Sequence, residues 1–229
     1  MTSKRGVAHD VRDETMKLGA DLVAIATAES LKGAPKGHGP EDILRGAKSI
    51  ISIALAVPSA AFDSAPSREY SISYIVANNE LNRIAFRVAR LLERRGFKAL
   101  PIPASPPYDL ENNMGDMSHR HAAIAAGLGV LGRNSLLLTP QFGGRVRLTT
   151  IVTDAELEPD EPIVFDPCAG CDRCIVACPA RALKGYGVVD KRKCDQHHLK
   201  VGKELQLKDW EQMCGVCIRV CPVGRKRKG

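Results

Sequence analysis

Hydrophobic and polar residues alternate along residues 7–154 in segments that switch between helical and strand periodicity. Helical periodicity covers residues 7–19, 39–47, 71–95 and 118–129, and strand-like runs cover residues 20–28, 48–57 and 97–103. Residues 59–67 are predicted as a loop, and residues 134–140 and 145–154 as a hairpin around Gly143 and Gly144. Helices that alternate with strands before a closing hairpin predict an α/β or α+β domain with a mixed sheet.

Two of these segments carry the predicted core. Residues 48–57 are apolar nearly throughout, which predicts a strand covered on both faces. The longest predicted helix, residues 71–95, ends at Gly96 and shows one apolar stripe at three- and four-residue spacing. We expect this stripe to pack in the core: Ile72, Ile75, Val76, Leu81, Ile84, Ala85, Val88, Leu91 and Leu92.

Composition restricts the class of protein. The chain has 229 residues, of which 44% are hydrophobic and 26% charged, as in ordinary soluble proteins. No apolar run reaches the roughly 18–20 residues that cross a bilayer, and the first residues contain no apolar signal-peptide core. We therefore expect a cytoplasmic protein without a membrane partner.

The eight cysteines all fall between residues 168 and 221. Thiols clustered in one part of a cytosolic chain indicate metal binding, whereas stapling disulfides belong to small secreted folds. The first run has the spacing C-x2-C-x2-C-x3-C-P, which is typical of [4Fe–4S] ligands. Its members are Cys168, Cys171, Cys174 and Cys178, followed by Pro179.

The second set ends in C-x2-C-x3-C-P and repeats most of this pattern. It comprises Cys194, Cys214, Cys217 and Cys221, followed by Pro222. In two-cluster ferredoxins the fourth cysteine of such a run binds the other cluster. This rule predicts one [4Fe–4S] cluster on Cys168, Cys171, Cys174 and Cys221, and a second on Cys178, Cys194, Cys214 and Cys217. Zinc or mixed metal sites are the main alternative, although zinc sites usually need two separate C-x2–4-C pairs.

The formal net charge of +7 could indicate a nucleic-acid partner. Two oxidised clusters on eight thiolates would add about four negative charges, so the net charge would fall to about +3. The remaining basicity is concentrated in residues 224–229, which we expect to be a solvated end or, alternatively, a contact for tRNA.

The segment "SHRHAAIAAGLGVLGRNSLLLTPQFGGRVRLTTIVTD" and the cysteine arrangement that follows make the chain similar to a known family. The sequence resembles epoxyqueuosine reductases and corrinoid-dependent reductive dehalogenases, and the stretch "GAKSIISIAL" resembles their early strand. The resemblance implies a nitroreductase-like α/β domain at residues 1–165 that holds a cobalamin. A small ferredoxin-like domain with two [4Fe–4S] clusters would occupy residues 166–229.

The resemblance also implies site residues outside the cysteines. Both groups need a proton donor near the corrin, and "SREYS" at residues 67–71 takes the place of a "G-R-D-Y-H" stretch without its Gly and His. Glu69 and Tyr70 are therefore the catalytic candidates, although a Glu at a helix start is also favoured by the helix dipole alone. Arg133 and Asn134 are candidates for cofactor binding, whereas His119 and His121 can equally be satisfied polar contacts.

Together these features predict an iron–sulfur oxidoreductase that passes electrons to a cobalamin or to a substrate. The resemblance implies a low-potential electron donor of the ferredoxin or flavodoxin type and a small or nucleoside-like substrate. The alternative is an electron-transfer protein without substrate chemistry of its own. An RNA-associated role has only the basic end in its favour, because few aromatic residues (4%) are present for base stacking.

Overall fold

The computed structural model describes residues 3–105, 109, 114–208 and 213–225, so most of the basic end, residues 226–229, lies outside it. The chain forms two compact units. The sheet unit comprises Met1–Leu55, Asn78–Leu128 and Arg147–Ile163. The cysteine unit comprises Ala56–Ala77, Gly129–Val146 and Val164–Gly229, so it takes two segments from the first 165 residues. The predicted domain boundary between residues 165 and 166 stays a prediction.

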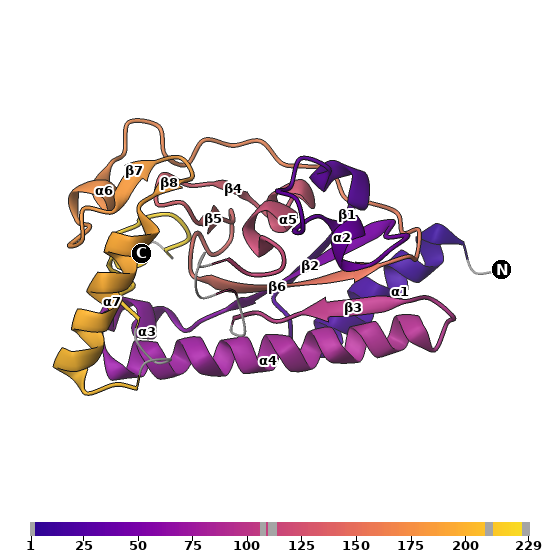
Figure 1. Cartoon of the computed structure of the whole chain (residues 1–229), viewed down its shortest axis with the longest axis horizontal. Coiled ribbons are helices and arrows are strands. Elements are labelled where there is room, and N and C mark those ends of the chain that lie inside the picture. Colours follow the sequence, from indigo (N-terminus) through magenta and orange to yellow (C-terminus); the bar gives the residue numbers. More distant parts are fainter. Residues whose placement is uncertain (1–2, 106–108, 110–113, 209–212, 226–229) are drawn as a thin grey trace. The chain divides into compact units, whose positions relative to one another are not determined.

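Four strands form one sheet in the order β1 (Leu22–Thr27), β2 (Ser49–Ala56), β6 (Val146–Thr153), β3 (Ala99–Ile102) (Figure 1). β1 is antiparallel to β2, and β3 is antiparallel to β6. Backbone hydrogen bonds from Lys48 N to Thr153 O and from Val57 N to Arg145 O give β2 and β6 the same antiparallel relation. The predicted α/β or α+β class is confirmed. The sheet, however, is antiparallel and not mixed. Between β1 and β2 the chain reverses through the 3-10 helix η1 (Ala28–Leu31) and α2 (Pro40–Ile43).

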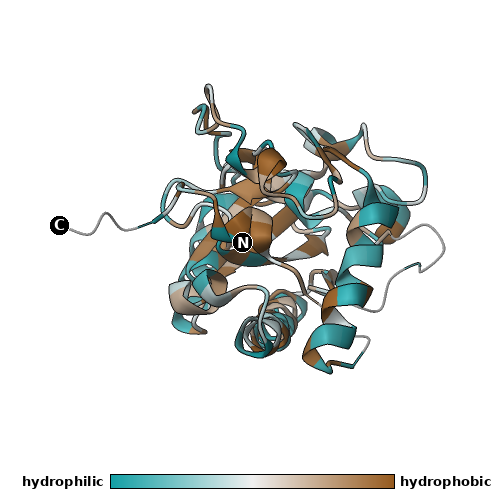
Figure 2. Ribbon diagram, turned by 90° about the vertical axis from the view of Figure 1, so that its left-hand side faces the viewer, coloured by the Kyte–Doolittle hydropathy of each residue, from teal (hydrophilic) through white to brown (hydrophobic). Residues whose placement is uncertain are grey.

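The sheet has a hydrophobic core on each face. Ile51 and Ile53 of β2 join the larger core with α1 (Lys4–Lys17) and α4 (Arg68–Glu93). Ile50, which points to the opposite face, joins the smaller core with α5 (His119–Ala125). Hydropathy colouring shows the same segregation, with hydrophobic strands and mostly hydrophilic helix surfaces (Figure 2). The prediction that residues 48–57 form a strand covered on both faces is confirmed.

The apolar stripe of α4 is buried only in part. Its C-terminal members Leu81, Ile84, Ala85, Val88 and Leu92 are at most 1% exposed and belong to the larger core. Ile72 and Val76 are 48% and 59% exposed, so the prediction of one continuous buried stripe is wrong for these two residues. They lie on the part of α4 that belongs to the cysteine unit.

Two local predictions are also wrong. Residues 59–64 form α3 (Ser59–Ser64) rather than a loop, because this single short turn buries Ala61 and Phe62. The predicted hairpin around Gly143 and Gly144 is reduced to one isolated antiparallel bridge between Thr139 and Gly143, since the strands of its two arms pair elsewhere. β5 (Leu137–Leu138) pairs with β4 (Val130–Leu131), and β6 pairs within the large sheet.

Short elements build the remainder of the cysteine unit. They are α6 (Arg173–Val176), β7 (Leu183–Gly185), β8 (Val188–Val189), α7 (Lys191–Leu205) and α8 (Val216–Arg219). α7 begins at the N-cap Asp190, whose side chain accepts a hydrogen bond from Lys193 N at 3.1 Å. Within the described ranges, no helix is both long and apolar enough to cross a bilayer.

His119 at the start of α5 is a buried polar contact of the sheet unit. Its Nε2 lies 2.8 Å from the carbonyl oxygen of Pro103, which can only accept, so Nε2 carries the proton. Its Nδ1 lies 2.8 Å from Thr150 Oγ1 and therefore accepts from that hydroxyl. His121, the other histidine of this helix, contacts Ser118 Oγ at 2.8 Å.

We expect His119 to remain neutral until the pH approaches 4. Burial lowers its pKa from 6.5 to about 4, while the Pro103 contact opposes this shift and the charge of Arg147 adds to it. Because the folded pKa lies below the unfolded one, the contribution to stability is complete above pH 6.5 and is lost as the pH falls towards 4. The full loss amounts to about 3 kcal/mol.

Histidine side-chain NMR across the acidic range measures this titration directly. The variant His119→Gln assigns the resonance, and His9→Gln removes an exposed imidazole as the matched control. An imidazole of His119 that titrates near 6.5 would contradict the buried, neutral state.

Candidate metal centre

The two cysteine runs fold into similar local structures. Each run has a one-turn helix, α6 or α8, that contains one cysteine and is followed by a Cys-Pro pair. The two helices contact each other, and α8 also contacts α3. All eight cysteines are free thiols. The repeated motif in the sequence therefore corresponds to a repeated motif in space.

The first thiol set consists of Cys168, Cys171, Cys174 and Cys221. These four residues line one cavity together with Pro167, Arg173 and Leu138. Burial raises the pKa of Cys221, and the neighbouring charges of Cys168 and Cys171 raise it further. The last cysteine of the chain therefore lies with the first three.

The second thiol set consists of Cys178, Cys194, Cys214 and Cys217. The nineteen residues between Cys194 and Cys214 contain most of α7, which the sequence analysis did not predict. Burial raises the pKa of Cys194 to about 11, and Cys214 and Cys178 lie near enough to contribute. His198 Nε2 lies 3.8 Å from Cys194 Sγ.

Backbone N–H groups point towards several of the thiols. Ala182 N donates to Cys178 Sγ at 3.3 Å. Burial raises the pKa of Cys214, while a hydrogen bond from the Val216 backbone lowers it. Burial raises the pKa of Cys217 to about 12, so this thiol would keep its proton until a metal binds. Metal binding would release that proton and compensate the charge of the thiolate.

The spacing of the thiols differs from that of a single-ion site. In the part of the chain that the structure describes, no three His, Cys, Asp or Glu side chains converge closely enough to hold one metal ion. A structural zinc site holds four ligands at about 2.0–2.3 Å from one ion. A [4Fe–4S] cluster binds each thiolate through a different iron, which leaves the thiolates further apart. The two thiol sets fit clusters better than zinc.

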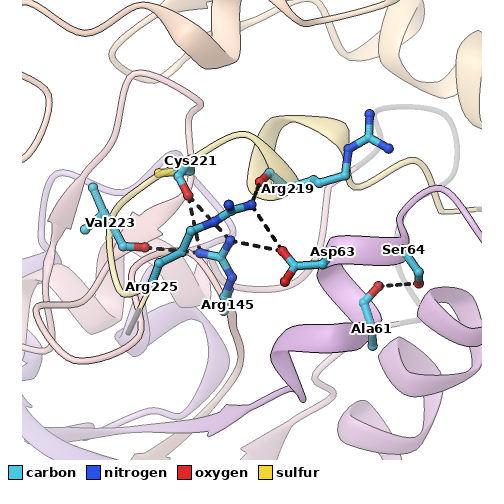
Figure 3. A network of polar contacts seen from close by, with 8 residues as sticks. All are labelled: Ala61, Asp63, Ser64, Arg145, Arg219, Cys221, Val223 and Arg225. Atoms are coloured by element: carbon cyan, nitrogen blue, oxygen red, sulfur yellow. Dashed lines mark hydrogen bonds and ion pairs between the residues drawn. The ribbon is translucent and has the colours of Figure 1, made fainter. Parts of the chain in front are cut away.

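A buried arginine holds the segment that carries Cys221. The side chain of Arg145 is 3% exposed, and its two terminal nitrogens each donate to Cys221 O at 3.4 Å. Nη1 also donates to Val223 O at 3.2 Å. Asp63 lies 3.8 Å from Arg145 and 3.1 Å from Arg225, which also donates to Arg219 O (Figure 3). This network ties α3 and the start of β6 to the Cys221 segment.

Two glycines allow the backbone around Cys221 to approach the loop before β6. Gly143 has φ +56°, and a Cβ there would lie 2.0 Å from Val223 O. Gly224 has φ +73°, and its Cβ would lie 2.0 Å from the carbonyl carbon of Phe142. Neither position accepts a side chain without moving backbone. Gly143, which the sequence assigned to a hairpin turn, therefore serves a long-range contact with the segment that carries Cys221.

The cofactor-binding candidates Arg133 and Asn134 both lie in the cysteine unit. Asn134 is 4% exposed and lines the cavity of the first thiol set. The guanidinium of Arg133 lies 5.8 Å from the ring centre of Tyr186. Of these two candidates for cofactor binding, Asn134 is the one that the structure places beside the thiols.

The catalytic candidates Glu69 and Tyr70 differ in exposure. Glu69 is exposed in the first turn of α4, where the helix dipole favours a carboxylate. Tyr70 is 3% exposed, and its ring centre lies 5.2 Å from that of Phe62. A Cβ at Gly215 would lie 2.5 Å from Tyr70 Cε1, so the ring covers the turn between Cys214 and Val216. The structure thus places Tyr70 beside the second thiol set.

The network of Arg145 and Asp63 has no signal in the sequence. Arg145 is a charged residue at a strand start, a position where arginines are commonly exposed, and Asp63 fell in a predicted loop. Their roles depend on contacts with residues 76 to 162 positions away in the chain, and local spacing gives no signal for such contacts.

Comparison with known proteins agrees with this geometry. Residues 167–224 match the profile of the 4Fe-4S double cluster binding domain. An epoxyqueuosine reductase from Bacillus cereus is 31% identical over 85% of this chain. The chain is a homologue of the epoxyqueuosine reductases. The present chain spans only about half, 52%, of the length of the Bacillus cereus protein.

Solved structures show the same fold. One is an epoxyqueuosine reductase in complex with an epoxyqueuosine-modified tRNA stem loop, with a TM-score of 0.67 and 22% identity. The match covers 94% of the present chain and 64% of the reductase chain. Another is a reductive dehalogenase whose structure suggests a mechanism for B12-dependent dehalogenation, with a TM-score of 0.76 and 21% identity. The match covers 99% of the present chain and 33% of the dehalogenase chain.

Replacing Arg145 by Met should release the Cys221 segment. The substitution removes charge-assisted hydrogen bonds to buried carbonyls, which should cost about 2–4 kcal/mol of stability. We expect less iron per chain and a lower melting temperature after anaerobic purification, with Arg145→Lys intermediate.

The control is Arg225→Met, because Arg225 belongs to the same network but its side chain is 48% exposed. An exposed ion pair contributes about 0–1 kcal/mol, so this variant should resemble the wild type. If Arg145→Met kept its iron as well as Arg225→Met does, Arg145 would have no role in holding the segment.

Proposed function

We propose that this chain is an iron–sulfur reductase that passes electrons from two [4Fe–4S] clusters to a cobalamin and thereby reduces a substrate. The observation that carries the proposal is the convergence of eight free thiols into two sets in one compact unit. The match of residues 167–224 to the double cluster binding domain supports the same cofactor. Bound clusters would supply one-electron transfer, and a corrin cobalt would supply a low-valent centre for reductive bond cleavage.

The proposed ligands follow the two sets. Cys168, Cys171, Cys174 and Cys221 would hold one cluster, and Cys178, Cys194, Cys214 and Cys217 the other. The support is proximity: Cys168 lies near enough to raise the pKa of Cys221, and Cys178 lies near enough to raise that of Cys194. Apolar residues between the ligands, such as Ile175 and Val216, would limit the access of water and so influence the potentials.

The cobalamin is supported by two observations. A structural relative performs B12-dependent dehalogenation. In this chain, the exposed apolar side chains Ile72 and Val76 stand one turn apart on α4, just after Glu69 and Tyr70. Two neighbouring apolar side chains of this kind could pack against the apolar edge of a large planar macrocycle. We propose that Ile72 and Val76 contact the corrin and that Glu69 or Tyr70 donates the proton that a reductive step requires.

The substrate class follows from the relatives alone. One epoxyqueuosine reductase structure contains a modified tRNA stem loop, which supports a nucleoside-like substrate, in tRNA or free. A low-potential electron donor of the ferredoxin or flavodoxin type would supply the electrons. Reduced thiols and such a donor both suit the cytoplasm.

Iron and sulfide analysis tests the clusters and their crossed ligation. Anaerobically purified protein should contain about eight iron and eight sulfide atoms per chain. Cys221→Ala and the double variant Cys168→Ala/Cys221→Ala should both retain about four of each, because the two residues share one cluster. Cys217→Ala/Cys221→Ala should lose both clusters.

The double variants separate the crossed assignment from a sequential one. If each run held its own cluster, Cys168→Ala/Cys221→Ala would lose all iron. Zinc in place of iron in the wild type would remove the redox function altogether.

Cobalamin titration followed by visible spectroscopy tests the second cofactor. We expect a spectral shift and co-elution, and weaker binding by several-fold in Ile72→Asp/Val76→Asp, because charged groups would face the apolar edge. Phe86→Asp is the control, since Phe86 is also exposed on α4 but belongs to the sheet unit.

Absence of any shift in the wild type would favour an electron-transfer protein without substrate chemistry of its own. Glu69→Gln that binds cobalamin and keeps full activity would exclude Glu69 as the proton donor, and Tyr70→Phe tests the other candidate in the same way.

A further inference from the structure

The side chain of Asn134 faces the first thiol set from the turn between β4 and β5. It lines the same cavity as Cys168, Cys171, Cys174 and Cys221. The residue is 4% exposed, so the amide is inside the protein and not at its rim. An amide carries both donors and acceptors, and a buried donor requires an acceptor.

One hydrogen bond fixes the orientation of this amide. Asn134 Oδ1 accepts from the backbone N–H of Leu136 at 3.2 Å. If the amide were rotated by half a turn, its NH2 group would face that N–H, and two donors would oppose each other. The oxygen is therefore directed to the backbone, and the nitrogen is the atom left for the cavity.

The nitrogen of this amide is a buried donor without an acceptor in the described part of the chain. Nδ2 has no hydrogen-bond partner among the residues that the structure describes. The amide oxygen lies close to Gly132, where an added Cβ would come within 2.6 Å of Asn134 Oδ1, so glycine at this position leaves the space that the amide occupies. Ser135, the next residue, has φ +62°, which holds the turn in a left-handed conformation.

We propose that Asn134 Nδ2 donates a hydrogen bond to a sulfur atom of the cluster held by the first thiol set, and thereby raises the reduction potential of that cluster. The inference rests on the proposed clusters but not on cobalamin or on the substrate. It assigns to Asn134 a contact with a cluster, whereas the resemblance implied a contact with the corrin.

The direction of the effect follows from charge. Reduction adds one electron to the cluster, so its total charge with four thiolates changes from about −2 to about −3 and its sulfur atoms become better acceptors. A hydrogen bond to sulfur therefore stabilises the reduced state more than the oxidised state. No proton is transferred, because the amide keeps its hydrogen in both states.

Redox titration monitored by EPR measures the proposed effect in the full-length protein. Asn134→Asp keeps the oxygen that accepts from Leu136 and removes the donor, while Asn134→Leu removes both at similar size. The loss of one hydrogen bond should lower the equilibrium constant for reduction of one cluster about two- to tenfold in Asn134→Leu. The decrease should be larger in Asn134→Asp, whose charge opposes the added electron, and the other cluster should change less.

The matched control is Asn82→Asp in the sheet unit. Asn82 Oδ1 also accepts from a backbone N–H, that of Ala104 at 2.9 Å, so the substitution makes the same chemical change away from the thiols. We expect both potentials of this control to equal those of the wild type. Equal potentials in Asn134→Asp, Asn134→Leu and the wild type, at full iron content, would overturn the proposal.

A measurement on the wild type covers the case in which the variants fail to assemble clusters. Protein labelled with 15N in the asparagine side-chain amides is reduced and studied by pulsed EPR. A 15N coupling to one cluster is expected, and its absence would overturn the proposal. Failure of the cobalamin titration leaves both measurements intact, whereas a wild type without clusters would overturn this inference and the proposed function together.

Discussion

A single buried guanidinium, that of Arg145, holds the carbonyl oxygens of Cys221 and Val223 at the position where the chain returns to its first three cysteines. The return brings Cys221, which lies 47 residues beyond Cys174 in the sequence, to the cavity that the first three cysteines line. Bringing distant segments together costs chain entropy. Hydrogen bonds to buried carbonyls, the ion pair with Asp63 and the close approach of Gly143 and Gly224 all act on this one segment.

The same guanidinium also has an electrostatic role. It lies near Cys221 and lowers the pKa of that thiol, although burial, the largest cause, raises it. Burial and the charge of Arg225 lower the pKa of Arg145 itself, while Asp63 and Cys221 oppose this change. A cluster with four thiolates is anionic, so a cation that is kept dry beside it compensates charge that water cannot reach. Arg145 thus both holds the backbone of the Cys221 segment in place and supplies positive charge beside the Cys221 thiol.

The double cluster domain could be predicted from the sequence because spacing within a cysteine run is a local property. Steps of two residues place three thiols around one point, and the repeated motif predicts a crossed fourth ligand. The contacts of Arg145 and the place of Asn134 in the cavity of the first thiol set could not be predicted, since each depends on a segment that is remote in the chain. The α4 stripe shows the same limit. Its period correctly gave the apolar face, but not which part of that face the protein itself would cover, so Ile72 and Val76 were wrongly placed in the core.

The interleaving of the cysteine unit has a consequence for its evolution. Asp63, Asn134 and Arg145 come from segments that precede the cysteines by up to about a hundred residues, yet they complete the surroundings of the first thiol set. A gene fragment that encoded residues 166–229 alone would carry every thiol and none of these partners. A gene rearrangement that moved this portion alone would therefore separate the thiols from the guanidinium that holds Cys221 O and Val223 O.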